Sequence, residues 1–362
     1  MDNELKMNDR KGNRLAIVAG VILVLAIIGG GFFAFKTLSN STNQEEQKNQ
    51  QKEDVPVEPK KEESKIKIVD VNSKTRPFGI MVNCHNEALP QSGLQDAYMV
   101  YEIMVEYGIT RMFALFKDVD FSKVGSIRSL RSQYIAYAFE NDAVIAHAGG
   151  QLEATNRLSN EGIAHVDVDG KYGQRDKELA KKRAWEHTLF TNSSLLTKAL
   201  NDMNIRKTTE SKPLLTYSAD PVDLSKYETK QANKITIKYS NYRTSSYDYD
   251  SSSTNYLRNI GNKKNVDLVT GKQYQVKNII VYGVKYETYT LRGTGYQKMN
   301  NIGTGDGYYI TNGVALPITW SKTDEKSKTV YKIKETGEEL KVNDGNTYIQ
   351  IYPSNGGKLT IS

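Results

Sequence analysis

An uncharged apolar run near the N-terminus constrains this chain more than any other feature. Residues 15–35 read LAIVAGVILVLAIIGGGFFAF, about the length that an α-helix needs to cross a bilayer. Basic residues precede this run more densely than they follow it. By the positive-inside rule, that asymmetry places the N-terminus in the cytoplasm and the rest of the chain outside. We therefore predict a single-pass cell-membrane protein, with a cytoplasmic tail at residues 1–14 and a transmembrane helix at residues 15–36.

A cleaved signal peptide is the alternative interpretation of the same run. Signal peptides have an apolar core of roughly 7–15 residues, followed by a cleavage site with small side chains. Phe32, Phe33 and Phe35 stand where such a site would lie. The single cysteine, Cys84, is too far along the chain to be a lipidated N-terminal residue. These observations favour an uncleaved signal-anchor over cleavage.

The segment after the apolar run is polar and of mixed charge. Residues 37–65 contain almost no large apolar side chains. Such a segment buries too little surface to offset the entropy of ordering. We predict a disordered linker that separates the folded part from the membrane.

Charge and cysteine content exclude several classes of function. The formal net charge of +7 over 362 residues is a mild excess, which does not indicate nucleic-acid binding. One cysteine cannot form an internal disulfide or a dithiol metal or redox motif. We predict no nucleic-acid partner, no metal site and no cofactor.

The first folded region, residues 66–215, shows patterns of an α/β (α+β) domain with a mixed sheet and flanking helices. We predict a buried strand at residues 79–82, followed by a polar loop at residues 83–94. The β-branched and aromatic content of residues 96–118 favours two strands joined by a turn. A helix over residues 96–106 is the alternative.

The rest of this region alternates between helix and strand patterns. A helix is predicted from Ser126 or Ser129 to Glu140, because a serine cap precedes a stripe of apolar residues. A buried strand in residues 143–150 and a helix over residues 151–160 follow. A further helix is expected to begin near Ser193.

Two arginines in the stretch KVGSIRSLRSQ indicate an anion. Arg128 and Arg131 fall at the predicted helix start, where each cation costs roughly 0.3–1 kcal/mol against the helix dipole. Either an external anion or the carboxylates of Glu102 and Glu106 must compensate the positive charge of the two arginines. We favour an external anion, since arginine binds phosphate and carboxylate groups through two parallel hydrogen bonds.

The carboxylates themselves have two interpretations. Glu102 and Glu106 are four residues apart, a spacing that places them on one side of either a strand or a helix. Arg111 is their expected partner across the turn. A structural salt-bridge cluster is slightly favoured over a catalytic carboxylate pair.

Further candidates follow the predicted buried strand. His147 lies near the strand's carboxyl end, and Gly149-Gly150 opens the next helix with free N–H groups for an anion. A polar block later supplies Arg175, Arg183 and His187. Each of these residues also has an ordinary structural interpretation.

The second region, residues 216–362, is predicted to be mainly antiparallel β-structure. Short β-type runs at hairpin spacing include KITIKYS, KNIIVYGVKYET, VALPITWSK and TYIQIYP. Asn312-Gly313 and Asp344-Gly345 are turn signals between them. The glycines of residues 291–307 favour a loop or hairpin connection over a phosphate loop, because no helix pattern follows them.

Long stretches of the chain resemble the YerB-like family of bacterial envelope proteins. The resemblance rests on RPFGIMVNCHNEALPQSGLQDAYMVYEIMVEYGITRMFALF, KVGSIRSLRSQYIAYAFENDAVIAHAGG and GDGYYITNGVALPITW. The resemblance spans roughly residues 75–354. It implies the fold of that family, whose domain is of unknown function, and a location in the cell envelope. It implies no established activity. Many members are lipoproteins; here an apolar anchor stands in place of the lipidated cysteine. The residues that carry the resemblance are Gln91, Ser92, Gly93, Glu102, Glu106, Thr110, Arg111, Gly125, Arg128, Arg131, His147, Gly149, Gly150, Arg183 and His187.

We expect a membrane-anchored, extracytoplasmic protein that binds an anionic ligand or an envelope protein through a cleft lined by arginine and histidine. The expected ligand is a phosphate-containing wall polymer or a lipid-linked precursor. The expected ligand-binding residues are Gln91, Ser92, Arg111, Arg128, Arg131, His147, Gly149, Gly150, Arg183 and His187. The alternative is a transferase or hydrolase of phosphate-containing glycopolymers, with Glu102, Glu106 or His147 as general acid or base. A purely structural role is a third hypothesis.

Overall fold

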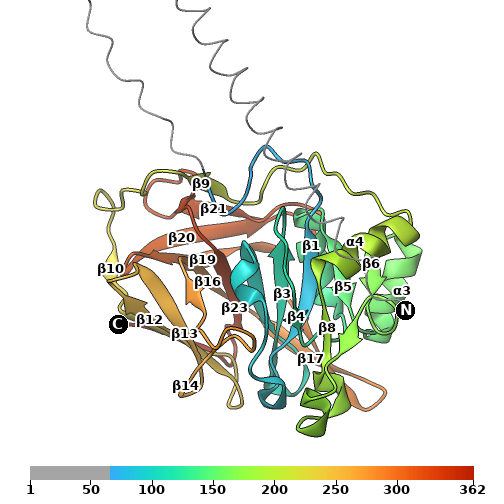
Figure 1. Cartoon of the computed structure of the whole chain (residues 1–362). Coiled ribbons are helices and arrows are strands. Elements are labelled where there is room, and N and C mark those ends of the chain that lie inside the picture. The colour runs from blue at the N-terminus through green and yellow to red at the C-terminus, as the bar shows by residue number, and fades with distance from the viewer. Residues whose placement is uncertain (1–65) are drawn as a thin grey trace, which may run out of the picture. The chain divides into compact units, whose positions relative to one another are not determined.

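The computed structural model describes residues 66–362, in which one large mixed sheet organises the fold (Figure 1). None of the helices in this part of the chain is long and apolar enough to span a membrane. The predicted anchor at residues 15–36 and the linker at residues 37–65 lie outside the described residues. The large sheet has eleven strands, in the order β10 (Lys230–Gln231), β20 (Val314–Lys322), β19 (Gly303–Thr311), β16 (Asn278–Val284), β23 (Thr347–Pro353), β2 (Met99–Met104), β3 (Thr110–Phe116), β1 (Phe78–Asn83), β5 (Val144–His147) and β6 (His165–Asp167), with β21 (Val330–Ile333) paired to β20.

Strands from both predicted regions share this sheet. Strand β23 lies between β16 and β2 and pairs with both in parallel, with Ile349 opposite Tyr101 and Ile280. The sheet therefore contains strands from both sides of the predicted boundary at residues 215–216. The division into two domains at that boundary stays a prediction. Strands β23, β2 and β3 are buried along almost their whole length, because their apolar residues do not alternate with polar ones.

A second sheet of six strands packs beside the first, at the lower left of Figure 1. The other described sheets are small. The second sheet runs β14 (Lys263–Lys264), β13 (Asn255–Ile260), β12 (Thr244–Asp250), β11 (Lys234–Lys238) and β24 (Lys358–Ile361), with β15 (Gln275–Val276) paired to β13; the small sheets are β17 (Tyr286–Leu291) with β18 (Thr294–Met299), β22 (Lys341–Asn343) with β9 (Thr216–Ser218), and β4 (Val124–Gly125), β8 (Leu189–Thr191) and β7 (Gln174–Arg175).

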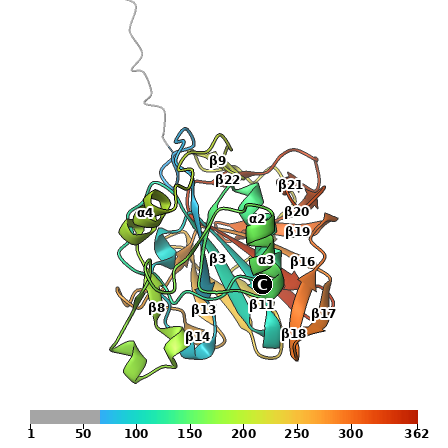
Figure 2. The same cartoon turned by 90° about the vertical axis from the view of Figure 1, so that its right-hand side faces the viewer.

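The helices of the described residues gather at one end of the large sheet. Figure 2 views the molecule from this end, with α2 and α3 in front of the sheet and α4 to one side. Their bounds are α2 (Ile135–Glu140), α3 (Leu152–Asn160) and α4 (Ser193–Asp202), and the short 3₁₀ helices are η1 (Asn86–Ala88), η2 (Leu94–Asp96), η3 (Glu106–Gly108), η4 (Ser132–Tyr134), η5 (Leu179–Lys181) and η6 (Trp185–His187).

Most of the predicted elements are confirmed. Strand β1 covers the predicted residues 79–82, β2 and β3 are the two strands predicted within residues 96–118, and the alternative of a helix over residues 96–106 is wrong. The strand ending at His147, the helix of residues 151–160 and the helix at Ser193 are present. The C-terminal runs form mostly antiparallel strands, and residues 291–307 connect β17, β18 and β19 without a helix.

The helix predicted from Ser126 or Ser129 is wrong over its first half. Residues 126–131 are extended, because long-range backbone hydrogen bonds replace a local cap: Arg128 N–H donates to Met81 at 2.9 Å and Leu130 N–H to Gly149 at 3.1 Å. The α-helix begins only at Ile135, after a 3₁₀ turn. Arg128 therefore lies clear of the helix start, and the dipole argument for an anion does not apply to it; Arg131 directly precedes the 3₁₀ turn, and Glu106 is its partner.

Candidate functional site

Arg131 and Arg111 share one carboxylate. Glu106 accepts hydrogen bonds from two nitrogens of Arg131, one of them Nε at 2.8 Å, and lies 3.6 Å from Arg111 Nη2. Burial alone would raise the pKa of Glu106, but the hydrogen bonds from Arg131 and the charge of Arg111 outweigh it and lower the pKa to about 2. The cluster matches the interpretation of a structural salt bridge.

Glu102 belongs to a different cluster, which joins the two sheets. Its carboxylate lies 2.9 Å from Arg258 Nη2 on β13, and both side chains are fully buried. It also accepts hydrogen bonds from Thr110 at 2.7 Å and Ser245 at 3.0 Å. Burial raises the pKa of Glu102, yet the charge of Arg258 and the hydrogen bonds leave it below its usual value. Glu102 and Glu106 are thus ionised partners of different arginines, with no shared reacting centre.

His147 is buried in a hydrogen-bonded pair with His165. Its Nδ1 donates to the carbonyl of Gly149 at 2.8 Å, and its Nε2 lies 3.0 Å from Nδ1 of His165. A carbonyl only accepts, so the proton of neutral His147 is on Nδ1 and Nε2 accepts from His165. Burial lowers the pKa of His147, which favours this neutral form.

The glycines after His147 are already bonded within the fold. Gly149 N–H donates to Asp167 at 3.1 Å, and Gly150 forms an isolated bridge with Leu130. Gly149 and Gly150 therefore join α3 to the extended segment that carries Arg128. Their predicted role in anion binding stays a prediction.

Three other predicted residues hold the loop of residues 83–94 in place. Gln91 Nε2 donates to Asn83 O at 2.8 Å, and Ser92 Oγ donates to Lys123 O at 2.9 Å. Arg183 donates to the carbonyls of Ala88 and Leu89, at 3.0 and 2.9 Å. These hydrogen bonds hold the backbone of the loop and so fix the positions of its other side chains.

Two histidines and a glutamate meet on one side of this loop. His85 stacks on His187, with ring centroids 5.1 Å apart and an interplanar angle of 9°. His187 Nε2 lies 3.6 Å from Glu87, and one ligand atom from each of the three residues lies within 4.8 Å of the others. The proximity alone would suit a metal ion.

The hydrogen bonds of the two histidines argue against a metal. Asn83 Oδ1 accepts from His85 N–H at 2.9 Å, which turns Asn83 Nδ2 toward His187 Nδ1 at 2.8 Å. Because the amide nitrogen only donates, His187 Nδ1 accepts and its proton is on Nε2. His85 Nδ1 accepts from Glu87 N–H at 3.3 Å in the same way. A metal-ligating histidine instead donates through its second nitrogen.

Arg128 lies near His187, and its guanidinium forms no ion pair with any residue that the structure describes. Its neighbour Ile127 donates to Leu189 O at 2.7 Å, so the segment runs between β1 and β8. The Nε of Arg128 is buried and has no hydrogen-bond partner among the described residues. Burial lowers the pKa of His187, and the positive charge of Arg128 adds to this effect.

The loop of residues 83–94 also borders a cavity of about 730 Å³, here named the basic pocket. Arg243, Lys263 and Lys264 line it, and its lining residues include no aspartate or glutamate. Asn241 and Asn262 add amide groups from the turns of the smaller sheet, before β12 and before β14.

Arg243 is the most informative residue of the basic pocket. Only 1% of it is exposed, and its Nη2 donates to Cys84 O and to Asn86 Oδ1. Its Nε and Nη1 have no hydrogen-bond partner among residues 66–362. A buried guanidinium with unmet donors costs free energy, and together with the exposed Lys263 and Lys264 it gives this pocket a positive charge that suits an anion.

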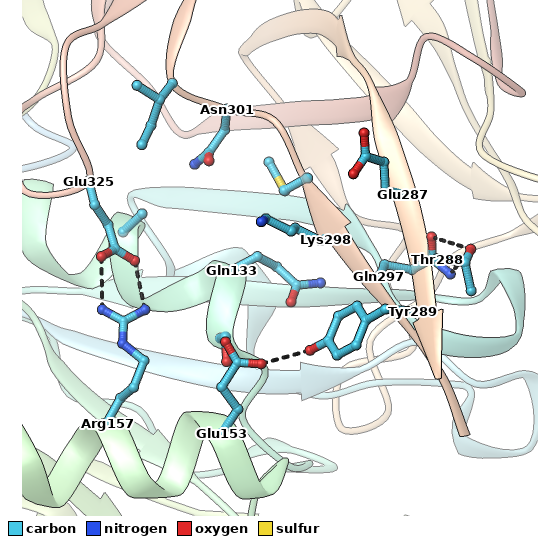
Figure 3. A pocket seen from close by; sticks show the side chains of 14 residues that line it. Gln133, Glu153, Arg157, Glu287, Thr288, Tyr289, Gln297, Lys298, Asn301 and Glu325 are labelled. Atoms are coloured by element: carbon cyan, nitrogen blue, oxygen red, sulfur yellow. Dashed lines mark hydrogen bonds and ion pairs between the residues drawn. The ribbon is translucent and has the colours of Figure 1, made fainter. Parts of the chain in front are cut away.

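A second cavity, of about 580 Å³, lies between α3 and the β17–β18 hairpin (Figure 3). Its arginine is already paired: Arg157 lies 2.7 Å from Glu325, and Glu153 accepts from Tyr289 at 2.8 Å. Lys298 extends into the cavity, but three glutamates outnumber the two cations of the lining. This cavity therefore does not suit an anion.

Comparison with known proteins relates this fold to a family. Residues 66–206 match the N-terminal domain, and residues 235–349 the C-terminal domain, of the family described as "Protein of unknown function (DUF3048)". The chain belongs to this family. The YerB-like resemblance is confirmed: the chain is 26% identical over 316 residues to "Putative lipoprotein YerB" of Bacillus subtilis (strain 168), covering 84% of this chain and 90% of the relative.

A solved structure shows the same fold. The crystal structure of the YerB protein from Bacillus subtilis matches with a TM-score of 0.68 and 23% identity. The match covers 80% of this chain and 94% of the YerB chain. The DUF3048 fold thus extends over both sheets of the described residues.

The sequence analysis missed the residues of the basic pocket. Arg243 and the Lys263-Lys264 pair come from turns of the smaller sheet, whose approach to residues 83–94 depends on long-range contacts such as the bridge of Gln91 with Asp267. The one local signal was two adjacent lysines after Gly261-Asn262, a turn that exposes both side chains.

Proposed function

We propose that this DUF3048 protein binds an anionic, hydroxyl-bearing ligand in the basic pocket, outside the membrane to which it is anchored. The observation that carries the proposal is a lining with three cations and no carboxylate. Arg243, Lys263 and Lys264 supply the positive charge, and two nitrogens of the buried Arg243 have no hydrogen-bond partner among residues 66–362. The ligand is a phosphate-containing wall polymer or a lipid-linked precursor.

The pocket chemistry fits a phosphate group carried on a polyol or a sugar. Arginine binds phosphate through parallel hydrogen bonds, and exposed lysines contribute point charges. Asn241 and Asn262 each offer a donor and an acceptor, which is what a hydroxyl group needs. The volume of about 730 Å³ is within the usual range for small-molecule sites.

The location outside the membrane is supported by two observations. Residues 15–35 form an apolar run with more positive charge before it than after it. The relative from Bacillus subtilis is named as a lipoprotein, a class held at the membrane surface. We propose that an apolar anchor takes the place of the lipid in this chain.

Binding is favoured over catalysis by the state of the three candidate acids and bases. Glu102 and Glu106 are held as ionised partners of buried arginines, and His147 is tied to Gly149 and His165. General acid–base catalysis needs a group that can exchange a proton near the operating pH. The transferase or hydrolase alternative, and a partner protein as the ligand, gain no support from these contacts.

The test is calorimetric titration of glycerol phosphate into the full-length protein in non-ionic detergent. The double variant Lys263→Ala/Lys264→Ala is expected to bind at least tenfold more weakly, because two cations of the pocket are lost. Lys332→Ala/Lys341→Ala is the matched control, since it removes two exposed lysines elsewhere. Equal affinity in both double variants contradicts the proposal.

A further inference from the structure

We infer that Arg128 forms a second anion-binding site next to the basic pocket, so that the natural ligand is a chain with two or more anionic groups. This inference rests on the proposed function, because the first anionic group occupies the basic pocket. It extends that function from a single phosphate to a polymer of phosphate and hydroxyl-bearing units.

The first argument is the unpaired guanidinium of Arg128. Neighbouring arginines have carboxylate partners, since Arg131 binds Glu106 and Arg175 lies 2.8 Å from Asp169. Arg128 makes no ion pair among the described residues, and its buried Nε has no acceptor. The charge of the exposed Glu186 is the largest acidic influence on it. An arginine whose backbone is held in place and whose guanidinium has no carboxylate partner can donate hydrogen bonds to an anion.

The second argument is the proton arrangement of the adjacent histidines. Asn83 Nδ2 and Glu87 N–H occupy the Nδ1 atoms of His187 and His85, so each ring carries its N–H on Nε2. These donors suit an acceptor oxygen and do not suit a metal ion. Glu87 is the competing acceptor, but it lies 3.6 Å from His187 and its side chain is 66% exposed, so it can swing away.

The third argument is that the two sites are adjacent. His85 belongs to the histidine cluster and Asn86, the next residue, lines the basic pocket. Tyr242 also lines the pocket, and its ring centroid lies 6.3 Å from that of His85. Tyr242 is 47% exposed, so it offers a ring face between the two cationic sites. A ligand that leaves the pocket past Tyr242 meets the histidines next.

A repeating chain matches this alternation of charge and ring. Trp185, in the same 3₁₀ turn as His187, is 60% exposed and stacks against Arg175, with the guanidinium 4.6 Å from the ring centroid. Aromatic faces pack against sugar rings or carbon backbones, while the cations bind the phosphates between them. The mild net charge of +7 argues for a polyol phosphate over a nucleic acid.

The experiment compares two probes on the full-length protein in non-ionic detergent: glycerol phosphate and a synthetic tetramer of glycerol phosphate. Wild type is expected to bind the tetramer at least tenfold more tightly than the monomer. Arg128→Gln is expected to lose about tenfold in tetramer affinity and to bind the monomer like wild type. If Arg128→Gln fails to fold, Arg128→Lys replaces it, because lysine keeps the charge without the planar guanidinium. The tetramer affinity of Arg128→Lys is expected to be about threefold lower than that of wild type.

The outcomes separate this inference from the proposed function. Unchanged tetramer affinity in both Arg128 variants overturns the second site, even when Lys263→Ala/Lys264→Ala weakens the monomer as expected. If Lys263→Ala/Lys264→Ala leaves the affinity for the glycerol phosphate monomer unchanged, the proposed function itself fails. An oligonucleotide with four phosphates that binds as tightly as the tetramer overturns the assignment to polyol phosphates.

Discussion

Replacing Glu106 with glutamine tests whether this carboxylate is structural. In the fold it is shared by Arg111 and Arg131, and its pKa is lowered from 4.5 to about 2. This lowering corresponds to about 3 kcal/mol of folding free energy at neutral pH. Because the side chain is 7% exposed, solvent screens the interaction little. Glu106→Gln is therefore expected to lower the free energy of unfolding by about 3 kcal/mol at pH 7.

The pH dependence gives this prediction its sign. A carboxylate whose pKa is lower in the fold than in the unfolded chain stabilises the protein above pH 4.5 and loses that effect as the pH falls toward 2. By pH 3, wild type is expected to have lost about 2 kcal/mol of this contribution. The difference between wild type and Glu106→Gln should therefore narrow to about 1 kcal/mol.

Urea titrations of the full-length protein in non-ionic detergent, at pH 7 and pH 3, measure this difference. Glu210→Gln is the control, because its ion pair with Lys74 is exposed on both sides and should change stability by at most about 1 kcal/mol. If the difference between wild type and Glu106→Gln is the same at both pH values, the carboxylate is not held ionised by its arginines and the reasoning is refuted.

Three further predictions follow from the loop and its surroundings. Cys84 is fully buried and burial raises its pKa to about 11, so iodoacetamide should not label it at pH 8 until urea unfolds the chain; labelling of the native protein would contradict this. Arg183→Ala removes the hydrogen bonds to the carbonyls of Ala88 and Leu89 and should cost about 1–2 kcal/mol in unfolding free energy, measured by urea titration; an unchanged midpoint would show that these bonds do not hold the loop. Glu87→Gln removes the negative charge that competes with the ligand at His187 and should tighten binding of the glycerol phosphate tetramer about threefold; weaker binding in the titration would point to a role for Glu87 in the ligand site.

Much of the secondary structure could be predicted from local patterns. Strands β2 and β3 carry β-branched and aromatic residues and are buried on both faces. Such a run predicts a buried strand from the local sequence alone. The first half of the helix predicted from Ser126 to Glu140 failed because its local cap signal competed with bonds to Met81 and Gly149, which only the folded sheet supplies.

The candidate site was harder to predict for the same reason. The sequence drew attention to Arg128 and to the Glu102 and Glu106 carboxylates, but it paired both glutamates with Arg111. The partner of Glu102 is Arg258, 156 residues away on the second sheet. Arg243 gave no local signal at all, because its significance lies in a buried position with unmet donors. Long-range packing decides which cations are neutralised and which remain free.

The most direct test of the central claim is a crystal structure of the protein with glycerol phosphate bound. The account predicts the phosphate in the basic pocket, in contact with Arg243, Lys263 or Lys264. A phosphate bound elsewhere on the protein, with the basic pocket unchanged, would contradict it.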